Sequence, residues 1–387
     1  MLPEAVAAMT EELSLTGNAS SLHTSGRRAR RVVEEARERV AAALGAGPSD
    51  VIFTAGGTEA DNLAVKGLFW ARRAADPKRV RIIASQVEHH AVLDALDWLV
   101  DHEGAVVDWL PVDEVGRIDV SALHAALARD PGSVALVTVM WANNEVGTVQ
   151  PVADVVAAAH EHGVPVHSDA VQAVGQIDID FGASGLDCLT VSGHKLGGPV
   201  GAGAVLARRG LDLVPELHGG SQERGVRSGT LDVAALRAFG VAAEIAVRDR
   251  AEVVAVVGEL RDDLVRAITA AVPDVVLRGD PDPAGRLPFN AHVTIPGCEG
   301  DSLLYLLDAR GVECSTGSAC QAGVPQPSHV LLAMGVPEPV ARGALRFSLG
   351  RTSTAADVAA VAAAIGPAVE RARRAGVGAF ATDEVGS

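Results

Sequence analysis

Short apolar segments alternate with amphipathic segments over residues 27–209, and this alternation limits the folds that the chain can adopt. The apolar segments are rich in Val and Ile, which favour strands. The pattern predicts strands at 51–54, 80–84, 105–110, 134–140, 164–167, 187–191 and 202–207, and helices at 27–44, 59–72, 89–100 and 153–162. This order is typical of an α/β protein whose mostly parallel central sheet is covered by helices on both faces.

The pattern changes in the C-terminal third of the chain. The sequence there predicts a long helix over 251–271, a loop over 281–285, strands at 292–295 and 345–348, and a helix over 357–375. We therefore expect a large α/β domain over residues 1–250 and a smaller α+β domain over residues 251–387.

Polar residues of unusual kinds follow four of the predicted strands. In open α/β sheets, ligands bind outside the carboxyl ends of the strands, so residues at these ends meet in one crevice. The four groups are Gly56-Gly57-Thr58, Asn143-Asn144-Glu145, Asp169, and Ser192-Gly193-His194-Lys195. Their convergence indicates a ligand site more strongly than any one of them alone.

Gly56, Gly57 and Thr58 stand at the start of a predicted helix, where backbone N–H groups and the helix dipole favour an anion such as a phosphate. A second interpretation is that Thr58 only caps the helix. The segment lacks the Gly-Lys-Ser/Thr of a Walker A loop and the Gly-x-Gly-x-x-Gly of a dinucleotide site, so neither site is favoured.

Lys195 is one of only three lysines, and the other two, Lys66 and Lys78, stand in a predicted helix and in a polar loop. A desolvated lysine can form a Schiff base with an aldehyde. Pyridoxal phosphate is an aldehyde cofactor that also needs an acid for its ring nitrogen and donors for its phosphate. The alternative is a solvated turn lysine without this role. The candidates for the acid and the donors are Asp169, Thr58, Ser192 and His194.

The composition excludes several classes of protein. The 387 residues carry a formal net charge of −16, which argues against direct nucleic-acid binding and against binding to a membrane surface. No apolar run reaches the roughly 18 residues of a membrane span, and the first residues lack the pattern of a signal peptide. Four cysteines are too few for a disulfide scaffold, so we expect free thiols and a cytoplasmic location.

These motifs resemble those of the fold-type-I pyridoxal-phosphate enzymes of the aminotransferase class V group. Within that group the chain resembles the cysteine desulfurases of the nitrogen-fixation and housekeeping iron–sulfur type. The resemblance runs from near Gly17 to beyond Gly350, with the motifs in the family's order. They are Gly57-Thr58-Glu59-Ala60-Asp61-Asn62-Leu63, Val87-Glu88-His89-His90-Ala91-Val92, Asn143-Asn144-Glu145-Val146-Gly147, Asp169-Ala170-Val171-Gln172, Ser192-Gly193-His194-Lys195, His218-Gly219-Gly220-Ser221-Gln222-Glu223-Arg224, Arg227-Ser228-Gly229-Thr230, Ser318-Ala319-Cys320 and Arg346-Phe347-Ser348-Leu349-Gly350-Arg351.

The resemblance implies roles for these residues. Lys195 resembles the lysine that binds the cofactor and moves the substrate's protons, Asp169 the acid at the ring nitrogen, and His89 the catalytic histidine stacked on the ring. Gln172 resembles the donor to the phenolic oxygen, and Thr230 a phosphate ligand from the second subunit, which implies a homodimer. The implied cofactor-binding residues are Gly57, Thr58, His89, Asn144, Asp169, Gln172, Ser192, His194, Lys195 and Thr230, and the implied pair for the substrate carboxylate is Asn144 and Arg346.

The catalytic thiol implied by the resemblance is Cys320, which stands among small residues. Its thiolate would take the sulfur of L-cysteine, leaving L-alanine and a persulfide for a protein acceptor. That acceptor is an iron–sulfur scaffold or a tRNA-thiolation enzyme. Cys188 stands in a predicted apolar strand and Cys298 in a turn. Cys314 and Cys320 lack both Cys-x-x-Cys spacing and a nearby histidine pair, so we expect no metal site.

The chain departs from the family at its start. It lacks a stretch like Tyr-Leu-Asp-x-x-Ala-Thr-Thr-Pro and begins with Met1-Leu2-Pro3-Glu4. The alternatives on sequence are a selenocysteine lyase, another class V aminotransferase-type enzyme, and an inactive, N-terminally truncated paralogue that serves as a dimerising partner. Cys320 favours sulfur chemistry over transamination, which needs no thiol.

Overall fold

The computed structural model describes residues 1–317 and 326–383, and it divides the chain into two compact units. The first unit comprises Met1–Leu110, Asp119–Ala142 and Gln150–Arg250. The second comprises Pro111–Ile118, Asn143–Val149 and the chain from Ala251 onward. Each unit is described by itself.

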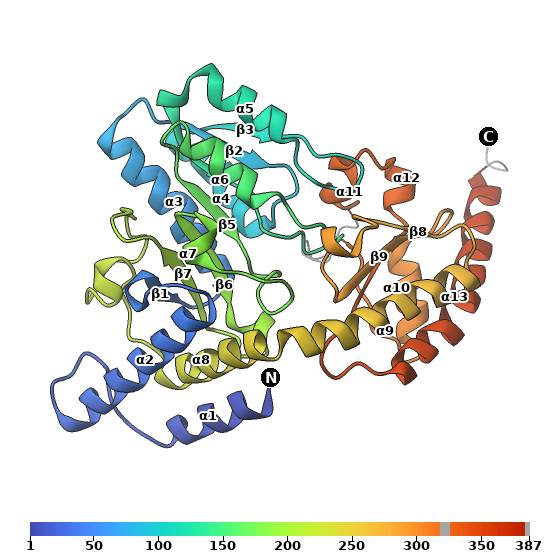
Figure 1. Ribbon diagram of the computed structural model, residues 1–387. Helices are drawn as coiled ribbons and strands as arrows, with labels where there is room; N and C mark the ends of the chain where they lie inside the picture. Colours follow the sequence, from blue (N-terminus) through green and yellow to red (C-terminus); the bar gives the residue numbers. More distant parts are fainter. Residues whose placement is uncertain (318–325, 384–387) are drawn as a thin grey trace. The chain divides into compact units, whose positions relative to one another are not determined.

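A seven-stranded sheet forms the centre of the first unit, with the strand order β1-β7-β6-β5-β4-β2-β3 (Figure 1). All neighbouring strands are parallel except β7, which runs antiparallel to both β1 and β6. The mostly parallel α/β sheet predicted from the sequence is thus confirmed. The strands are β1 (Val51–Thr54), β2 (Arg81–Ser85), β3 (Val106–Leu110), β4 (Val134–Thr138), β5 (Val166–Asp169), β6 (Cys188–Ser192) and β7 (Gly203–Ala207).

Helices cover both faces of this sheet, as Figure 1 shows. Apolar residues of α3 and α4 pack against the strands in one continuous core, while α1 and α2 pack along α8. The central strands are buried along their whole length, and this explains why they read as apolar runs. The helices are α1 (Pro3–Leu13), α2 (Thr24–Ala43), α3 (Gly57–Ala75), α4 (His90–Glu103), α5 (Val120–Arg129), α6 (Val152–His160), α7 (Phe181–Ser184) and α8 (Val233–Arg248).

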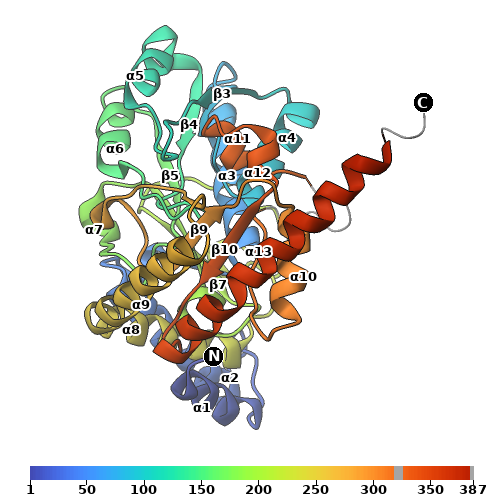
Figure 2. The same cartoon turned by 90° about the vertical axis from the view of Figure 1, so that its right-hand side faces the viewer.

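The second unit is built on a three-stranded antiparallel sheet with the order β10-β9-β8 (Figure 2). Helices α9, α10 and α13 pack apolar residues against β9 and β10 in a separate core. The strands are β8 (Val276–Leu277), β9 (Asn290–Thr294) and β10 (Ala344–Ser348). The helices are α9 (Arg250–Ala271), α10 (Gly300–Asp308), α11 (His329–Ala333), α12 (Glu338–Ala341) and α13 (Ala355–Asp383).

Short 3₁₀ turns connect several of these elements. They are η1 (Pro48–Asp50), η2 (Pro131–Ser133), η3 (Gly193–Leu196), η4 (Glu223–Gly225) and η5 (Pro283–Gly285). In the part of the chain that the structure describes, no helix has both the length and the apolar character needed to cross a membrane.

Candidate active site

The start of α3 forms an open cradle at the carboxyl end of β1. Gly56 precedes the helix with φ +149°, a backbone conformation that residues with a Cβ rarely adopt, and no side chain caps the helix. A Cβ on Gly57 would lie 3.0 Å from Cγ2 of Val171 and 3.4 Å from Cβ of Ser192. The helix start therefore lies directly against the end of β6, with backbone N–H groups available to an anion.

Thr58 does not cap α3. The capping position is Gly56, and Thr58 is the second residue of the helix, with an exposed side chain. The interpretation of Thr58 as a helix cap is therefore wrong, because α3 already begins at Gly57 and Thr58 lies inside its first turn. The hydroxyl of Thr58 stands at the first turn of the helix, where it can join the backbone groups as a donor.

Lys195 lies in the single 3₁₀ turn η3 that follows β6. Ser192 ends the strand, and its Oγ lies 2.8 Å from Nδ1 of His194. Burial lowers the pKa of His194, and the positive charge of Lys195 lowers it further. At neutral pH the His194 ring is therefore uncharged, and it can accept from Ser192 at Nδ1 while offering an N–H at Nε2.

Asp169 ends β5 and is buried. Its Oδ1 accepts a hydrogen bond from the backbone N–H of Val171 over 2.8 Å. Burial raises the pKa of Asp169 to about 6, while the Val171 hydrogen bond and the positive charge of Lys195 oppose this rise. The charge of Lys195 thus acts on Asp169, so the structure brings together the predicted acid and the predicted lysine.

A second buried carboxyl lies behind Asp169. Asp61 of α3 has Oδ1 3.7 Å from Nε2 of His167, which also lies 3.0 Å from Oγ1 of Thr190. Nδ1 of His167 lies 2.9 Å from Oγ1 of Thr138. Burial raises the pKa of Asp61 well above its ordinary range, and the charge of Asp169 adds to this. Burial also lowers the pKa of His167 to about 3, so this ring is uncharged at neutral pH, and the raised pKa of Asp61 favours its protonated form over that of Asp169.

His89 caps α4 with its ring. Nδ1 of His89 accepts from the backbone N–H of Ala91 over 3.1 Å, so in the neutral ring the proton is on Nε2. The preceding residue, Glu88, is fully buried, and its Oε1 accepts from the backbone N–H of Met140 over 2.7 Å. This bond ties the His89 turn to the chain just beyond β4, and together the two contacts fix the orientation of the ring.

Gln172 and Thr230 are two further residues that were expected to bind the cofactor. Gln172 is half-buried in the turn that follows Asp169, and its carbonyl oxygen accepts from Nε2 of Gln176 over 2.8 Å. Thr230 is exposed in the connection between η4 and α8. Among the described residues no contact links Thr230 with Thr58 or Ser192 of the same chain.

Asn144 and Arg346 are neighbours in the second unit. Nη1 of Arg346 donates to the carbonyl oxygen of Asn144 over 3.0 Å. The backbone of Arg346 also pairs with Ser315 in both directions, at 3.0 and 2.6 Å. Nε of Arg346 is buried and has no hydrogen-bond partner within the described residues. The guanidinium therefore keeps a donor with which it could bind a carboxylate.

Glu145 is a buried carboxyl for which no role was expected from the sequence. Its Oε2 accepts from Oγ of Ser328 over 2.5 Å, and a Cβ on Gly317 would lie 2.8 Å from the same oxygen. Burial raises the pKa of Glu145 to about 7, opposed by the Ser328 hydrogen bond and the charge of Arg346. Glu145 therefore contacts the chain on both sides of residues 318–325.

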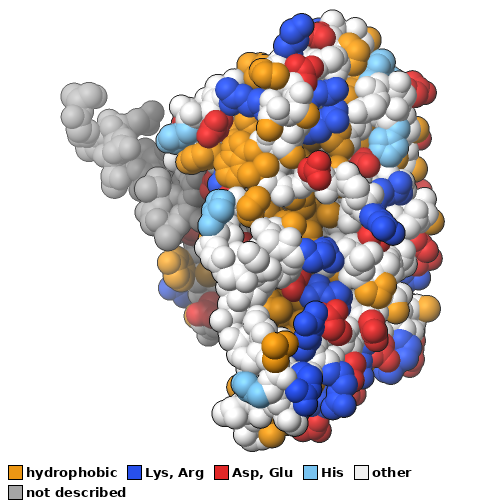
Figure 3. Space-filling model, turned by 90° about the vertical axis from the view of Figure 1, so that its left-hand side faces the viewer, with side chains coloured by type: hydrophobic (Ala, Val, Ile, Leu, Met, Phe, Trp, Pro, Cys, Tyr) orange, Lys and Arg blue, Asp and Glu red, His pale blue; other side chains and the backbone are white. Residues whose placement is uncertain are grey.

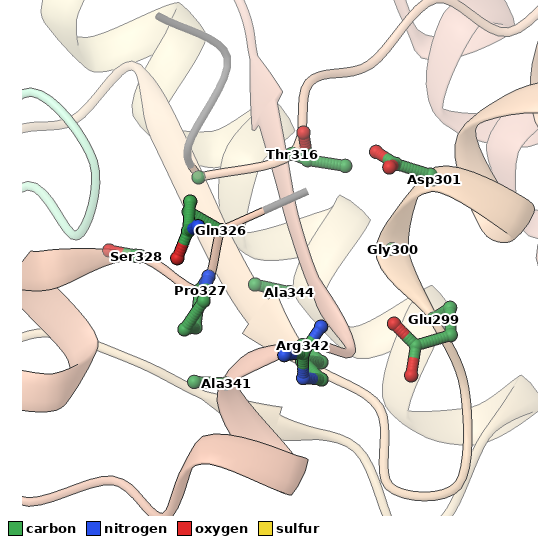
Figure 4. Close-up of a pocket in the computed structure, with 11 residues that line it drawn as sticks. Glu299, Gly300, Asp301, Thr316, Gln326, Pro327, Ser328, Ala341, Arg342 and Ala344 are labelled. Atoms are coloured by element: carbon green, nitrogen blue, oxygen red, sulfur yellow. The ribbon is translucent and has the colours of Figure 1, made fainter. Parts of the chain in front are cut away.

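The two ends of that segment line one pocket of the second unit (Figure 4). Thr316 precedes the segment and Gln326 follows it, and Figure 4 shows both side chains at the same pocket as Arg342 and Glu299. Cys320, the predicted catalytic thiol, belongs to residues 318–325 and lies outside the described part of the chain.

The other three cysteines are poor candidates for a reactive thiolate. Burial raises the pKa of the Cys188 thiol far above its ordinary value and raises that of Cys314 to about 11. Burial also raises the pKa of Cys298, although Arg373 opposes the rise. Because the thiolate is the nucleophilic form, these three side chains are mostly protonated and unreactive at neutral pH.

The described residues fit pyridoxal phosphate on chemical grounds. The uncapped start of α3, with Gly57 leaving room beside Ser192, suits a phosphate. Asp169 is a buried carboxyl that a protonated ring nitrogen would stabilise, and Lys195 acts electrostatically on the same carboxyl. The sequence alone did not reveal the supporting groups Asp61, Glu88 and Glu145. Their only signal was a charged residue inside a motif, because the partners of a buried charge are distant in the sequence.

Comparison with known proteins places the chain among characterised relatives. A model of the aminotransferase class-V family matches residues 1–361. An IscS-like cysteine desulfurase of Mycobacterium tuberculosis is 59% identical over 379 residues, covering 98% of this chain and 96% of the relative. The solved NifS-like protein of Rickettsia africae superposes with a TM-score of 0.85 at 30% identity, covering 96% of both chains. The structure of SspA in complex with cysteine has a TM-score of 0.75 at 31% identity, covering 92% of this chain and 97% of SspA.

Proposed function

The chain belongs to the aminotransferase class-V family, and from that premise we propose how its residues divide the work of the reaction. It is a pyridoxal-phosphate-dependent cysteine desulfurase, which removes sulfur from L-cysteine and gives L-alanine and an enzyme-bound persulfide. The roles assigned below to individual residues are our proposal.

Residues of the first unit hold the cofactor in this proposal. Gly57, Thr58, Ser192 and His194 bind the phosphate, while Lys195 binds the aldehyde carbon. When bound, the cofactor supplies an electron-withdrawing ring that weakens the bonds at the substrate's Cα and Cβ. With the cofactor bound, Asp169 would keep the ring nitrogen protonated, the ring of His89 would pack against the cofactor ring, and Gln172 would donate to the phenolic oxygen. The remaining cofactor-binding residues of the proposal are Thr230 and, from the second unit, Asn144.

Residues of the second unit bind the substrate carboxylate. The buried Nε of Arg346, without a partner in the described part of the chain, supports this role. Asn144 accepts from Arg346 through its carbonyl oxygen, which holds the guanidinium in place. An arginine fork binds a carboxylate through two parallel hydrogen bonds, and this fixes the orientation of L-cysteine.

Cys320 carries the sulfur chemistry. Its thiolate attacks Sγ of L-cysteine, forming an S–S bond, while the Cβ–Sγ bond breaks and its electron pair stays with the carbon skeleton. Lys195 takes the proton from Cα and later returns it to Cα, while Cβ gains a proton in place of the sulfur, so the skeleton leaves as L-alanine. The raised pKa of the other three thiols supports Cys320 as the nucleophile.

The observation that carries this proposal is the placement of Asp169 at the end of β5 and of Lys195 just after the neighbouring strand β6, where its charge acts on the buried Asp169 carboxyl. Alanine formation from L-cysteine by the purified protein tests it. We expect alanine and persulfide in equal amounts in a first turnover without reductant, and no product from Lys195→Ala. Alanine formed from L-selenocysteine alone would favour a selenocysteine lyase, and a keto acid product would favour an aminotransferase.

We also propose a homodimer in which Thr230 of the partner subunit completes the phosphate site. The exposure of Thr230 supports this. The face in Figure 3 carries a patch of apolar side chains next to a field of mixed acidic and basic ones, a composition that suits an interface core and its rim.

The broader assignments follow from the same proposal. The sulfur acceptor is a protein, either an iron–sulfur scaffold or a tRNA-thiolation enzyme. The proposed location is the cytoplasm, where free thiols such as Cys188, Cys298 and Cys314 persist. We assign residues 1–250 to a cofactor-binding domain and residues 251–387 to a C-terminal domain that carries Cys320.

A further inference from the structure

The connection between β7 and α8 contains a strained loop. Ser221, Glu223 and Arg224 have φ values of 58°, 46° and 58°, and within the described residues no other non-glycine residue has a positive φ. Such conformations persist only where surrounding contacts impose them, and they gather at functional sites. The contacts that impose them here are two Arg–Glu pairs.

The first pair joins this loop to α2 and β1. Arg37 of α2 holds Glu223 with a two-pronged contact, Nη2 to Oε1 at 2.7 Å and Nη1 to Oε2 at 2.8 Å. Oε2 of Glu223 also accepts from the backbone N–H of Phe53 over 2.7 Å, and Nη1 of Arg37 donates to the carbonyl oxygen of Val51 over 2.8 Å. Both charged side chains are buried.

The second pair joins the loop to the phosphate cradle. Nε of Arg227 lies 2.6 Å from Oε1 of Glu59, and Nη2 lies 3.2 Å from Oε2. Glu59 belongs to the first turn of α3, and its Oε2 accepts from the backbone N–H of Ala55 over 2.9 Å. The same carboxylate therefore fixes both the cradle and the loop.

The loop between the two pairs is closed on itself and ends in an exposed hydroxyl. The backbone N–H of Gly229 donates to Oε1 of Gln222 over 2.9 Å, and that of Ser221 donates to Oγ of Ser228 over 3.3 Å. Thr230 follows directly and is exposed. A rigid base thus presents one hydroxyl to the outside.

We propose that Arg37–Glu223 and Arg227–Glu59, together called the brace, are positioning pairs that hold Thr230 ready to bind the cofactor phosphate of the partner subunit. This inference rests on the proposed function, in which Thr230 acts across the dimer. Stability alone does not explain the brace well, because burying an ion pair costs desolvation that an apolar pair would avoid. Fixing a hydroxyl in advance removes the ordering cost that a free loop would bear on binding.

Mixed dimers test the brace. One chain carries Arg37→Lys, which keeps the charge but removes the fork, or Arg227→Gln, whose site is only half-buried. The other chain carries Lys195→Ala with an intact loop. Such a dimer has two cofactor sites, and only the site in the brace-variant chain keeps Lys195. Thr230 at that site comes from the other chain, whose loop is intact. The visible absorption of bound cofactor therefore reports on this site alone.

Each brace variant alone should bind the cofactor about tenfold or more weakly, the usual effect of losing a hydrogen bond to a charged group. In the mixed dimer, affinity at the site with Lys195 should return to within about twofold of the parent. Arg209→Gln, which alters an exposed arginine outside the brace, should bind like the parent in every dimer.

A loss that persists in the mixed dimers would show that the pairs act within their own subunit, and would overturn the inference. Thr230→Val separates this failure from failure of the proposed function. Normal cofactor affinity in Thr230→Val, or a monomeric parent, would remove the role of Thr230 across the dimer. Weak binding by Thr230→Val with normal binding by both brace variants would refute the brace alone.

Discussion

The hydroxyl of Ser328 lies 2.5 Å from Oε2 of Glu145, a carboxyl that is buried next to Arg346. The two residues are 183 positions apart, and Ser328 also caps α11 by accepting from the backbone N–H of Leu331. One short hydrogen bond therefore joins the segment after Asn144 to the chain just after residues 318–325. With the pKa of Glu145 raised to about 7, this junction titrates near physiological pH.

Glu145→Gln should flatten the dependence of stability on pH. Burial raises the pKa of Glu145 from 4.5 to about 7, so the protonated form contributes stability that is full below pH 4.5 and is lost as pH rises through 7. The loss is on the order of 3 kcal/mol at pH 8, at about 1.4 kcal/mol for each pH unit between the two values. Chemical denaturation at several pH values from 5 to 8 measures it.

Glu313→Gln is the matched control, because Glu313 is exposed and belongs to the same unit. We expect it to follow the parent at every pH. A Glu145→Gln protein whose stability falls with pH as steeply as that of the parent would show that Glu145 does not titrate in this range.

Asp169→Asn should weaken cofactor binding about tenfold or more at pH 8, since a hydrogen bond to a charged group is lost. In the parent, affinity should fall as pH drops below about 6, because Asp169 becomes protonated and no longer attracts a protonated ring nitrogen. The variant should lack this fall. Fluorescence titration with pyridoxal phosphate across pH 5–8 provides the measurement.

Asp61→Asn distinguishes the role of Asp61 from that of the second buried carboxyl, Asp169. Because burial and the charge of Asp169 raise the pKa of Asp61 and favour its protonated form, an amide in its place should leave cofactor affinity nearly unchanged. A loss as large as that of Asp169→Asn would mean that Asp61 carries the negative charge, contrary to our assignment.

Much of the fold could be predicted because strand signals are local. Three of the four residues of β1 are apolar, a glycine pair follows one residue after the strand, and the predicted bounds agree with the observed ones. Helices α5 and α8 were not predicted, although Asp119 and Asp232 cap them through backbone N–H groups. Strand β5 extends to Asp169, two residues beyond its predicted end. There the Asp169 carboxylate accepts a hydrogen bond from the backbone N–H of Val171 in the turn that follows.

The site could be predicted only in part. The sequence pattern indicates which residues follow each strand, but it does not indicate which distant residues pair with a buried charge. The approach of Lys195 to Asp169 follows from adjacent strand ends and could be expected. The contact of Arg37 with Glu223 joins residues 186 positions apart, and no periodicity predicts it. Glu145 gave a similarly weak signal, since its partner Ser328 lies in a distant segment.

Arg346→Ala should keep the bound cofactor but bind L-cysteine far more weakly. Removing a charged partner from a buried carboxylate costs roughly 2–5 kcal/mol, which corresponds to at least a thirtyfold loss of affinity at its lower end. The spectral change on titration with L-cysteine measures it. Arg342→Ala, at an arginine that lines the pocket of Figure 4 and also pairs with Glu338, is the control and should bind like the parent. Equal affinity in the Arg346 variant would show that another residue binds the carboxylate.

Cys320→Ala should bind the cofactor and L-cysteine but should form no persulfide, since it lacks the thiolate that takes the sulfur. Peptide mass spectrometry after incubation with L-cysteine, without reductant, locates the persulfide in the parent. Cys314→Ala is the control, and should react normally because burial raises the pKa of the Cys314 thiol to about 11. Persulfide on Cys314, or full alanine production by Cys320→Ala, would overturn the assignment of the nucleophile.

The central claim is that Lys195 binds pyridoxal phosphate, and the chain offers a sharp test because it contains only three lysines. Lys66 pairs with Glu216 at 3.2 Å, and Lys78 stands in a polar turn. Reduction of the cofactor-loaded protein with borohydride makes the lysine linkage permanent, and peptide mass spectrometry then identifies the modified residue. Our account predicts the pyridoxyl mass on Lys195 at one per chain, and its absence from Lys195→Ala. Modification of Lys66 or Lys78 in its place, or an unmodified Lys195 in loaded protein, would contradict it.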